Sequence, residues 1–192
     1  MKDDDINLTL AKDITMPAVA EGGINWIPVG GAYVNSAYQK YKGKIDGAGH
    51  TISGLCIISD DLGGFIGLLG EGGCVKNLTF ENAVIQGRGA SVVVGDNYGT
   101  VENCSVVSGS VSGSDIAGGI VQYNYGILSG CYNGAAVSCS NYGDTGGIAA
   151  RNGGTIMGCI NSGTKLGNPH NCGGIVGEQS GSTNAVCIAC GN

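Results

Sequence analysis

The sequence predicts an all-β fold, a right-handed parallel β-solenoid (β-helix) with coils of about 27 residues. Three observations predict it: glycine-marked repeats recur along the chain, short β-favouring runs lie between them, and no segment has a helical period. Glycine makes up 38 of the 192 residues and charged residues only 12%, against roughly 7% and 25% in ordinary domains. A regular array explains this composition better than an ordinary globular domain does.

The repeat is clearest as Gly-Gly followed by two apolar residues, at Gly63, Gly118, Gly146 and Gly173. The last three starts are separated by a nearly constant interval, which is the period of the repeat. The interval between the first two starts is twice as long, and Ser91 stands where the intervening glycine pair has been replaced. We therefore expect coils that begin near residues 63, 91, 118, 146 and 173.

The chain is expected to have two regions. Residues 63–192 form the glycine-rich solenoid, and residues 1–62, in which glycine pairs do not recur at the period of the repeat, form an N-terminal capping region with entry coils. A cap is expected because the bare end of a solenoid leaves strand edges and apolar layers open to aggregation.

Equivalent residues of successive coils should lie about 4.8 Å apart and form ladders along the axis. We expect an apolar ladder, an amide ladder and a thiol ladder. Their members are Ile120, Ile148 and Ile175, then Asn97, Asn124 and Asn152, then Cys104, Cys131 and Cys159. The pattern leaves open whether Ile120 or Val121 points inward.

Two further columns have expected roles. Glycine at positions 99, 126 and 154 is expected to take a positive φ at a corner. In the fifth coil, the thiol column is expected to hold Val186. The nine cysteines are odd in number, and we expect the column cysteines to be reduced core residues.

Charge and hydropathy exclude several partners. The net charge is −6, the pI is about 4.6, and the basic residues are scattered, so nucleic acid is not an expected partner. No apolar run approaches the roughly 20 residues of a membrane span, so membrane insertion is not expected. The first residues are acidic and unlike a signal peptide; we expect an export signal, if there is one, to lie outside this sequence.

Several motifs occur in a characteristic order along nearly the whole chain. They are Trp26-Ile-Pro-Val-Gly30, Ile45-Asp-Gly-Ala-Gly-His-Thr-Ile-Ser-Gly-Leu55, Gly64-Phe-Ile-Gly67, Val75-Lys-Asn-Leu78 and the later Gly-Gly-Ile-Val units. This order resembles the GLUG-repeat family of bacterial surface proteins. Such repeats occur in adhesins and beside the catalytic part of IgA-cleaving metallopeptidases. The resemblance implies an extracellular β-solenoid of the adhesin type within a larger chain.

Catalytic chemistry is not expected. A zinc peptidase needs a set of ligands such as His-Glu-x-x-His, and the only histidines are His50 and His170. The sequence predicts no metal site, no cofactor and no catalytic residue. The alternative is a polysaccharide-active β-helix enzyme, a lyase or hydrolase, which would need clustered carboxylates.

The acids do not cluster in the expected columns. Asp96 aligns with Tyr123, Arg151 and Glu178 of the following coils. The last two residues of this column suggest a surface ion pair, which is worth little. We therefore expect Arg151→Ala to be nearly neutral.

Tyrosines are the candidate ligand-binding residues, because aromatic rings on an exposed face can hold sugars. The candidates are Tyr98, Tyr123, Tyr125 and Tyr132. The alternative is that these rings cover exposed corners and keep their hydroxyl groups in water. The expected function is a non-catalytic extracellular module, either an adhesin domain that contacts host glycan or protein or a stalk.

Overall fold

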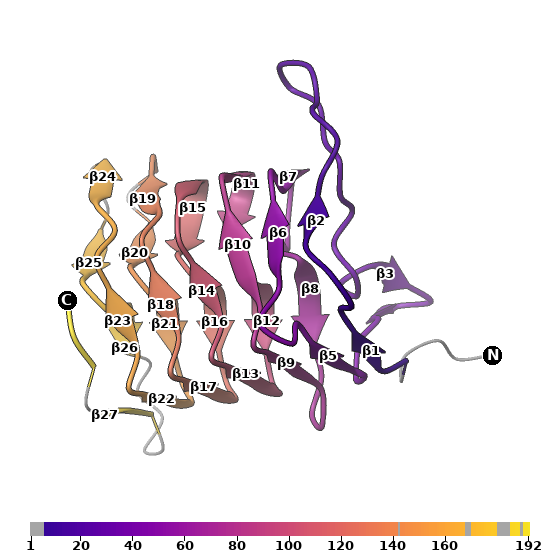
Figure 1. Cartoon of the computed structure of the whole chain (residues 1–192). Helices are drawn as coiled ribbons and strands as arrows, with labels where there is room; N and C mark the ends of the chain where they lie inside the picture. Colours follow the sequence, from indigo (N-terminus) through magenta and orange to yellow (C-terminus); the bar gives the residue numbers. More distant parts are fainter. Residues whose placement is uncertain (1–5, 142, 168–169, 180–184, 189) are drawn as a thin grey trace.

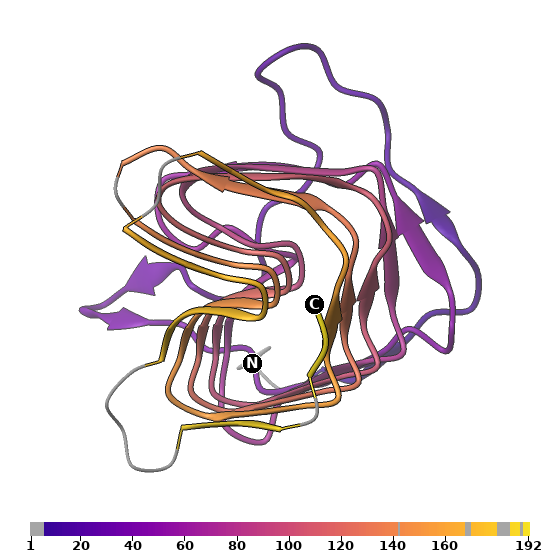
Figure 2. The same ribbon diagram turned by 90° about the vertical axis from the view of Figure 1, so that its left-hand side faces the viewer.

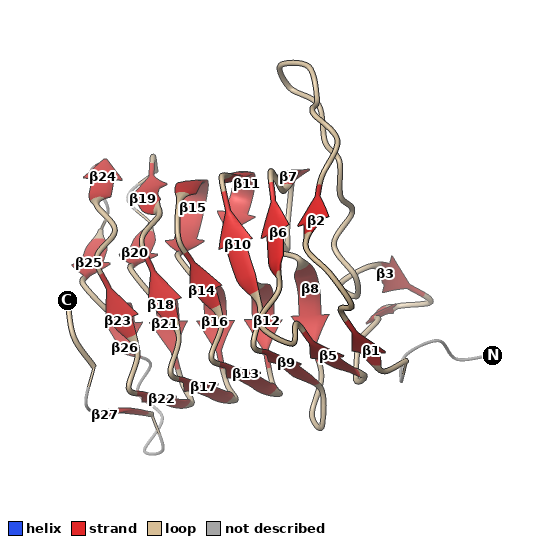
Figure 3. Ribbon diagram, in the orientation of Figure 1, coloured by secondary structure: helices blue, strands red, loops and turns tan. Residues whose placement is uncertain are grey.

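The computed structural model of the chain describes residues 6–141, 143–167, 170–179, 185–188 and 190–192. The described residues contain strands and no helix, and the strands stack in parallel into four walls (Figure 1). Figure 2 looks along the axis from the C-terminal end, and the chain runs counterclockwise as it approaches the viewer. The prediction of an all-β, right-handed parallel β-solenoid is confirmed. Figure 3 shows the same strands coloured by secondary structure.

The walls are named here in the order in which one coil passes through them. The first wall contains β8 (Ile66–Leu69), β12 (Val94–Asn97), β16 (Val121–Asn124), β21 (Ala149–Asn152) and β26 (Val176–Gln179). The second wall contains β1 (Leu8–Thr9), β5 (Lys44–Asp46), β9 (Cys74–Lys76), β13 (Thr100–Glu102), β17 (Ile127–Ser129), β22 (Thr155–Met157) and β27 (Val186–Ile188).

The third wall contains β2 (Ile14–Thr15), β6 (Thr51–Ser53), β10 (Thr79–Glu81), β14 (Ser105–Val106), β18 (Tyr132–Asn133) and β23 (Ile160–Asn161). The fourth wall contains β7 (Cys56–Ser59), β11 (Ala83–Ala90), β15 (Gly109–Gly118), β19 (Ala136–Cys139) and β24 (Lys165–Gly167), together with β20 (Asp144–Gly146) and β25 (Asn171–Gly173). Strands β12, β16 and β21 of the first wall pair in register at Asn97, Asn124 and Asn152. The coil length that the repeat predicted is therefore the coil length of the structure.

The N-terminal segment also follows the solenoid. Val29 and Tyr41 form isolated parallel bridges with Ile66 and Leu69 of β8, and between them the chain leaves the wall as a hairpin of β3 (Tyr33–Val34) and β4 (Ala37–Tyr38). A second excursion lies between β2 and β3 and projects from the solenoid in Figure 1. Residues before 62 thus contribute strands to the same walls as the later coils.

The Gly-Gly mark forms a tight inward turn. In Figure 2 the later coils turn back toward the axis between the fourth wall and the first. A Cβ atom on Gly118, Gly146 or Gly173 would overlap the carbonyl oxygen of the residue three positions later. The two arms of the turn are therefore closer than any side chain allows, which explains the repeated glycine.

A second amide ladder supports the same turn. A Cβ atom on Gly147 would overlap the side-chain amide of Asn161. Asn133 Nδ2 donates to Asn161 Oδ1 at 2.8 Å, and Asn161 Nδ2 donates to Asn192 Oδ1 at 2.9 Å. This ladder was not predicted from the sequence, although Asn133 and Asn161 are one period apart and that spacing was available as a signal.

The corner glycines act differently from the prediction. Gly99, Gly126 and Gly154 do not take a positive φ; a Cβ atom on any of them would overlap a carbonyl oxygen of the preceding coil. The left-handed residues are instead those just before the thiol column, with φ of 50° at Asn103, 60° at Gly130 and 57° at Gly158. Glycine and asparagine are the residues that tolerate this conformation best.

The core lies between the walls and includes both residues that the pattern could not distinguish. Ile120 and Val121 each have 0% exposure. Ile148 is also fully buried, and Ile175 is partly buried and packs against the core. Both positions of the pair are covered because the inward turn places protein on each side of it.

The thiol column differs from the prediction in the fifth coil. Val186 pairs with Thr155, and Cys187 pairs with Ile156. Cys190 therefore occupies the position of Cys159, and its thiol donates to the carbonyl of Ile188 at 3.3 Å. The assignment of Val186 to this column was wrong, because the fifth coil has a longer connection before β27 than its neighbours have before β17 and β22.

Candidate functional site

Three of the four candidate tyrosines lie together beside the first wall. Tyr98 and Tyr125 follow β12 and β16 at equivalent positions, and their rings stack at 4.8 Å between centroids with an interplanar angle of 17°. The ring centroid of Tyr123, on β16, lies 6.3 Å from that of Tyr125, with an interplanar angle of 4°. We call these three residues the tyrosine face. Tyr132 lies on the third wall, where its hydroxyl is 2.5 Å from Ser162 Oγ, and is not part of it.

The ladder that positions the tyrosine face is buried directly behind it. Asn97 Nδ2 donates to Asn124 Oδ1 at 2.8 Å, and Asn124 Nδ2 donates to Asn152 Oδ1 at 2.7 Å. Asn97 Oδ1 also accepts from the backbone N–H of Gly99. Each asparagine immediately precedes the position of the tyrosine column, so the amide ladder fixes the register of the tyrosine rings.

The two stacked rings differ in what they offer to a ligand. Lys40 Nζ lies 4.6 Å from the centroid of the Tyr98 ring, and Tyr125 stacks on that ring as well. Tyr125 is 48% exposed. In the next coil the column holds Gly153, which has no side chain to cover the ring of Tyr125. Within the tyrosine face, Tyr125 is therefore the residue with the most accessible ring surface.

A small pocket opens beside this ring. It has a volume of about 130 Å³ and is lined by Tyr123, Tyr125, Arg151, Gly153 and Glu178. Pockets for drug-sized ligands begin at roughly 300 Å³. This pocket therefore suits a single small ring, or one unit of a longer chain that runs across the surface.

Arg151 joins the pocket to a buried carboxylate. Its Nε forms ion pairs with Asp144 and with Glu178, the latter at 2.9 Å. The side chain of Asp144 is only 3% exposed and also accepts from Asn171 Nδ2 at 2.7 Å. Burial opposes ionisation of this carboxyl, but hydrogen bonds from Arg151 and Asn171 outweigh it and lower its pKa.

This network revises the expected effect of Arg151→Ala. The ion pair with Glu178 lies at the surface as expected, but the pair with Asp144 does not. Removing Arg151 would leave a buried carboxylate without its cation, a change that is strongly destabilising in other proteins. We therefore expect this substitution to be destabilising. The repeat pattern held no sign of the pair with Asp144, because Asp144 lies in a different column.

Asp96 is an acid of the site with a raised pKa. Its neighbours in the column are Leu68 and Tyr123, and its Oδ1 is buried with no hydrogen-bond partner among the described residues. Burial, together with the charge of Asp61, raises the pKa of Asp96 to about 6.

We expect Asp96→Asn to raise the thermal midpoint of unfolding at pH 8 and to change it little at pH 3.5. A carboxyl whose pKa is higher in the folded state gives stability that is present below its unfolded pKa, near 4, and is lost as the pH rises through about 6. The measurement is a pair of thermal melts for each protein. An equal shift at both pH values would contradict the assignment.

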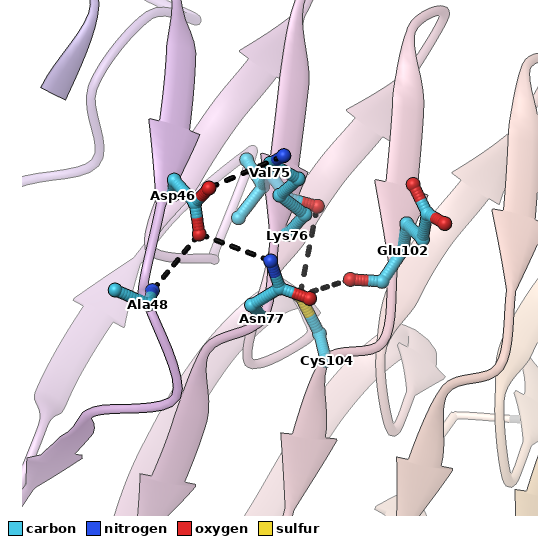
Figure 4. Close-up of polar contacts among 7 residues, drawn as sticks. All are labelled: Asp46, Ala48, Val75, Lys76, Asn77, Glu102 and Cys104. Atoms are coloured by element: carbon cyan, nitrogen blue, oxygen red, sulfur yellow. Dashed lines mark hydrogen bonds and ion pairs between the residues drawn. The ribbon is translucent and has the colours of Figure 1, made fainter. Parts of the chain in front are cut away.

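Asp46 provides a control, because its pKa is shifted in the opposite direction from that of Asp96 (Figure 4). Hydrogen bonds from the Ala48 N–H, the Asn77 amide and Lys76 lower the pKa of Asp46, so the stability from this group is present above its unfolded pKa and is lost as the pH falls. Asp46→Asn should therefore lower the midpoint at pH 8.

The cysteines of the thiol column lie in the core. Cys104, Cys131 and Cys159 are buried, and all nine cysteines have free thiols. Cys104 donates weakly to the carbonyls of Val75 and Glu102 at 3.6 and 3.5 Å (Figure 4), and burial raises its pKa to about 12. A thiol with so high a pKa is a poor nucleophile.

The described residues also lack two features that would point to other chemistry. Among them, no group of three or more histidine, cysteine and acidic side chains is arranged to hold a metal ion. Within the same part of the chain, no helix has the length and apolar character needed to cross a membrane.

Comparison with a solved structure shows the same fold in a bacterial protein. The crystal structure of a candidate immunoglobulin A1 protease from Bacteroides ovatus is 28% identical to this chain, with a TM-score of 0.76. The likeness covers 93% of this chain and 56% of that chain. No protein-family model matches this chain, so membership of the GLUG-repeat family stays a prediction.

Two curated relatives are similar over part of their length. Halomucin of Haloquadratum walsbyi is 35% identical over 120 residues, which are 59% of this chain and 1% of that protein. A candidate Gly-rich membrane protein of Evansella cellulosilytica is 36% identical over 108 residues, which are 52% of this chain and 12% of that protein. The chain therefore spans only a small part of the curated relatives it matches.

Proposed function

We propose that this chain is a non-catalytic solenoid module of a secreted or surface-attached protein and that it binds glycan on the tyrosine face. The observation that carries the proposal is the exposed ring of Tyr125 beside the donors and acceptors of Arg151 and Glu178. An aromatic ring with polar groups at its rim matches the apolar face and hydroxyl edge of a sugar.

The relatives support the setting of this module. One is named as a candidate membrane protein, and the chain matches only short stretches of both curated relatives. The solved neighbour is described as a candidate immunoglobulin A1 protease that is longer than this chain. A repeated β module within larger proteins of the cell exterior is consistent with all three.

The test is a glycan array probed with the wild-type chain and with a Tyr98→Ala/Tyr125→Ala variant. We expect binding by the wild type and a loss of about fivefold or more in the variant, because stacking of a nucleic-acid base on an aromatic side chain is worth roughly 1–3 kcal/mol by alanine substitution. Tyr132→Ala is the matched control, since that tyrosine lies on the third wall. Binding that survives in the double variant would contradict the tyrosine face, and an array with no signal would favour a stalk or a protein-binding module.

Glycan cleavage is the second candidate, and the raised pKa of Asp96 is the observation in its favour. A carboxyl whose pKa is raised toward neutral pH can act as a general acid. Two other acids of the site, Asp144 and Glu178, are both paired with Arg151, so we rank binding first. New reducing ends released by the wild type and not by Asp96→Asn would establish cleavage instead.

A further inference from the structure

We infer that the pocket beside Tyr125 takes one neutral sugar unit and disfavours sugars that carry a carboxylate. This inference rests on the proposed function and specifies its ligand. It follows from a gap in the tyrosine column and from the charges that surround this gap.

The gap is made by one residue. Asn97, Asn124 and Asn152 are in register on neighbouring strands, so the residues that follow them, Tyr98, Tyr125 and Gly153, form one column. A third tyrosine would stack on the second, as the second stacks on the first. Glycine at the third position leaves a space next to the ring of Tyr125, and the pocket lies there.

The walls of the space offer both partners that a hydroxyl group needs. Tyr123 lies nearly parallel to Tyr125, and the guanidinium carbon of Arg151 lies 5.7 Å from the centroid of the Tyr123 ring. A guanidinium carries five N–H donors. Both ion pairs of Arg151 are made by its Nε, so the guanidinium has further donors to offer to a ligand. The carboxylate of Glu178 is 42% exposed and can accept a hydrogen bond. A pyranose that stacks on the tyrosine would place its hydroxyl groups against these two side chains.

The charge of the site is negative. The single positive charge of Arg151 is shared by Asp144 and Glu178, and Asp96 lies in the same column one position beyond Tyr123. The ammonium group of Lys40 is held over the far side of Tyr98, not at the pocket. Because like charges repel, a sialic acid or uronic acid should bind more weakly than a neutral hexose.

The decisive variant is Gly153→Tyr, which adds a third ring to the column and closes the space beside Tyr125. The equivalent positions hold tyrosine in two coils, so we expect the column to accommodate a third ring. We expect binding to neutral glycans to fall at least tenfold while the thermal midpoint stays the same or rises. Gly153→Ala is the matched control and should retain binding, because a methyl group leaves most of the ring uncovered.

The probes are arrayed oligosaccharides that end in neutral hexoses or N-acetylhexosamines, beside counterparts that end in sialic or uronic acids. We expect the wild type to prefer the neutral set. Glu178→Gln removes one negative charge and keeps a hydrogen-bond acceptor. It should therefore strengthen binding to glycans that end in an acid and reduce the preference for neutral glycans. This second variant tests the charge argument independently of whether Gly153→Tyr folds.

The outcomes separate the two proposals. An array with no wild-type signal would overturn both the proposed function and this inference. Wild-type binding that Gly153→Tyr leaves intact, or that favours acid-terminated glycans, would overturn this inference and leave the glycan-binding function standing. An unchanged preference in Glu178→Gln would refute the role of charge.

Discussion

Ile148→Asp is expected to abolish cooperative folding. Ile148 is fully buried in the middle of the stack, and its backbone N–H and carbonyl bond to Ile175 and Ile120 at 2.9 Å each. Deleting a buried isoleucine side chain costs about 2–5 kcal/mol, and burying an unpaired carboxylate costs several kcal/mol more. The sum is comparable with the whole stability of a typical domain, about 5–15 kcal/mol.

The measurement is a thermal melt followed by circular dichroism, with Ile127→Thr as the control. Ile127 is 41% exposed and lies between Thr100 and Thr155 in its column, so threonine fits there. A melt of the aspartate variant within about 4 °C of the wild type, the shift expected for roughly 1 kcal/mol in a domain of this size, would show that this position is not in the core.

Gly146→Ala is expected to destabilise the fold by about 3 kcal/mol, at the upper end of what overpacking costs. The added Cβ would overlap the carbonyl oxygen of Ala149 across the inward turn and would also approach the backbone N of Gly177 at 2.8 Å. Both obstacles are backbone atoms, so no rotation of a side chain can relieve the overlap. The turn would have to open, and it is shared with the coils on either side.

Urea unfolding of this variant and of Gly158→Asn tests the prediction. Gly158 is left-handed, with φ of 57°, and an added Cβ would meet no atom within 4 Å. Asparagine already occupies the equivalent left-handed corner at Asn103, so the control should be close to neutral. Equal free energies of unfolding for the two variants would mean that the glycine pair is retained for a reason other than close backbone approach.

The candidate site was only partly visible in the sequence. The period of the repeat places Tyr98 and Tyr125 in one column, and the structure stacks their rings. Nothing in the local sequence shows that Lys40 covers one of these rings, because it comes from a segment outside the regular repeat. The link from Arg151 to Asp144 was also hidden, since the two residues lie on the two arms of the inward turn.

The sequence by itself determined the class of fold, the length of the coils and the register of the middle ones. A strict period suffices for this, because parallel stacking places each residue beside its equivalent one coil away. The tertiary structure decided the inward turn at each glycine pair and the replacement of Val186 by Cys190 in the thiol column. It also decided which ring of the tyrosine face is accessible to solvent. These features depend on the lengths of connections and on approaches between different walls, and a one-dimensional repeat does not encode either.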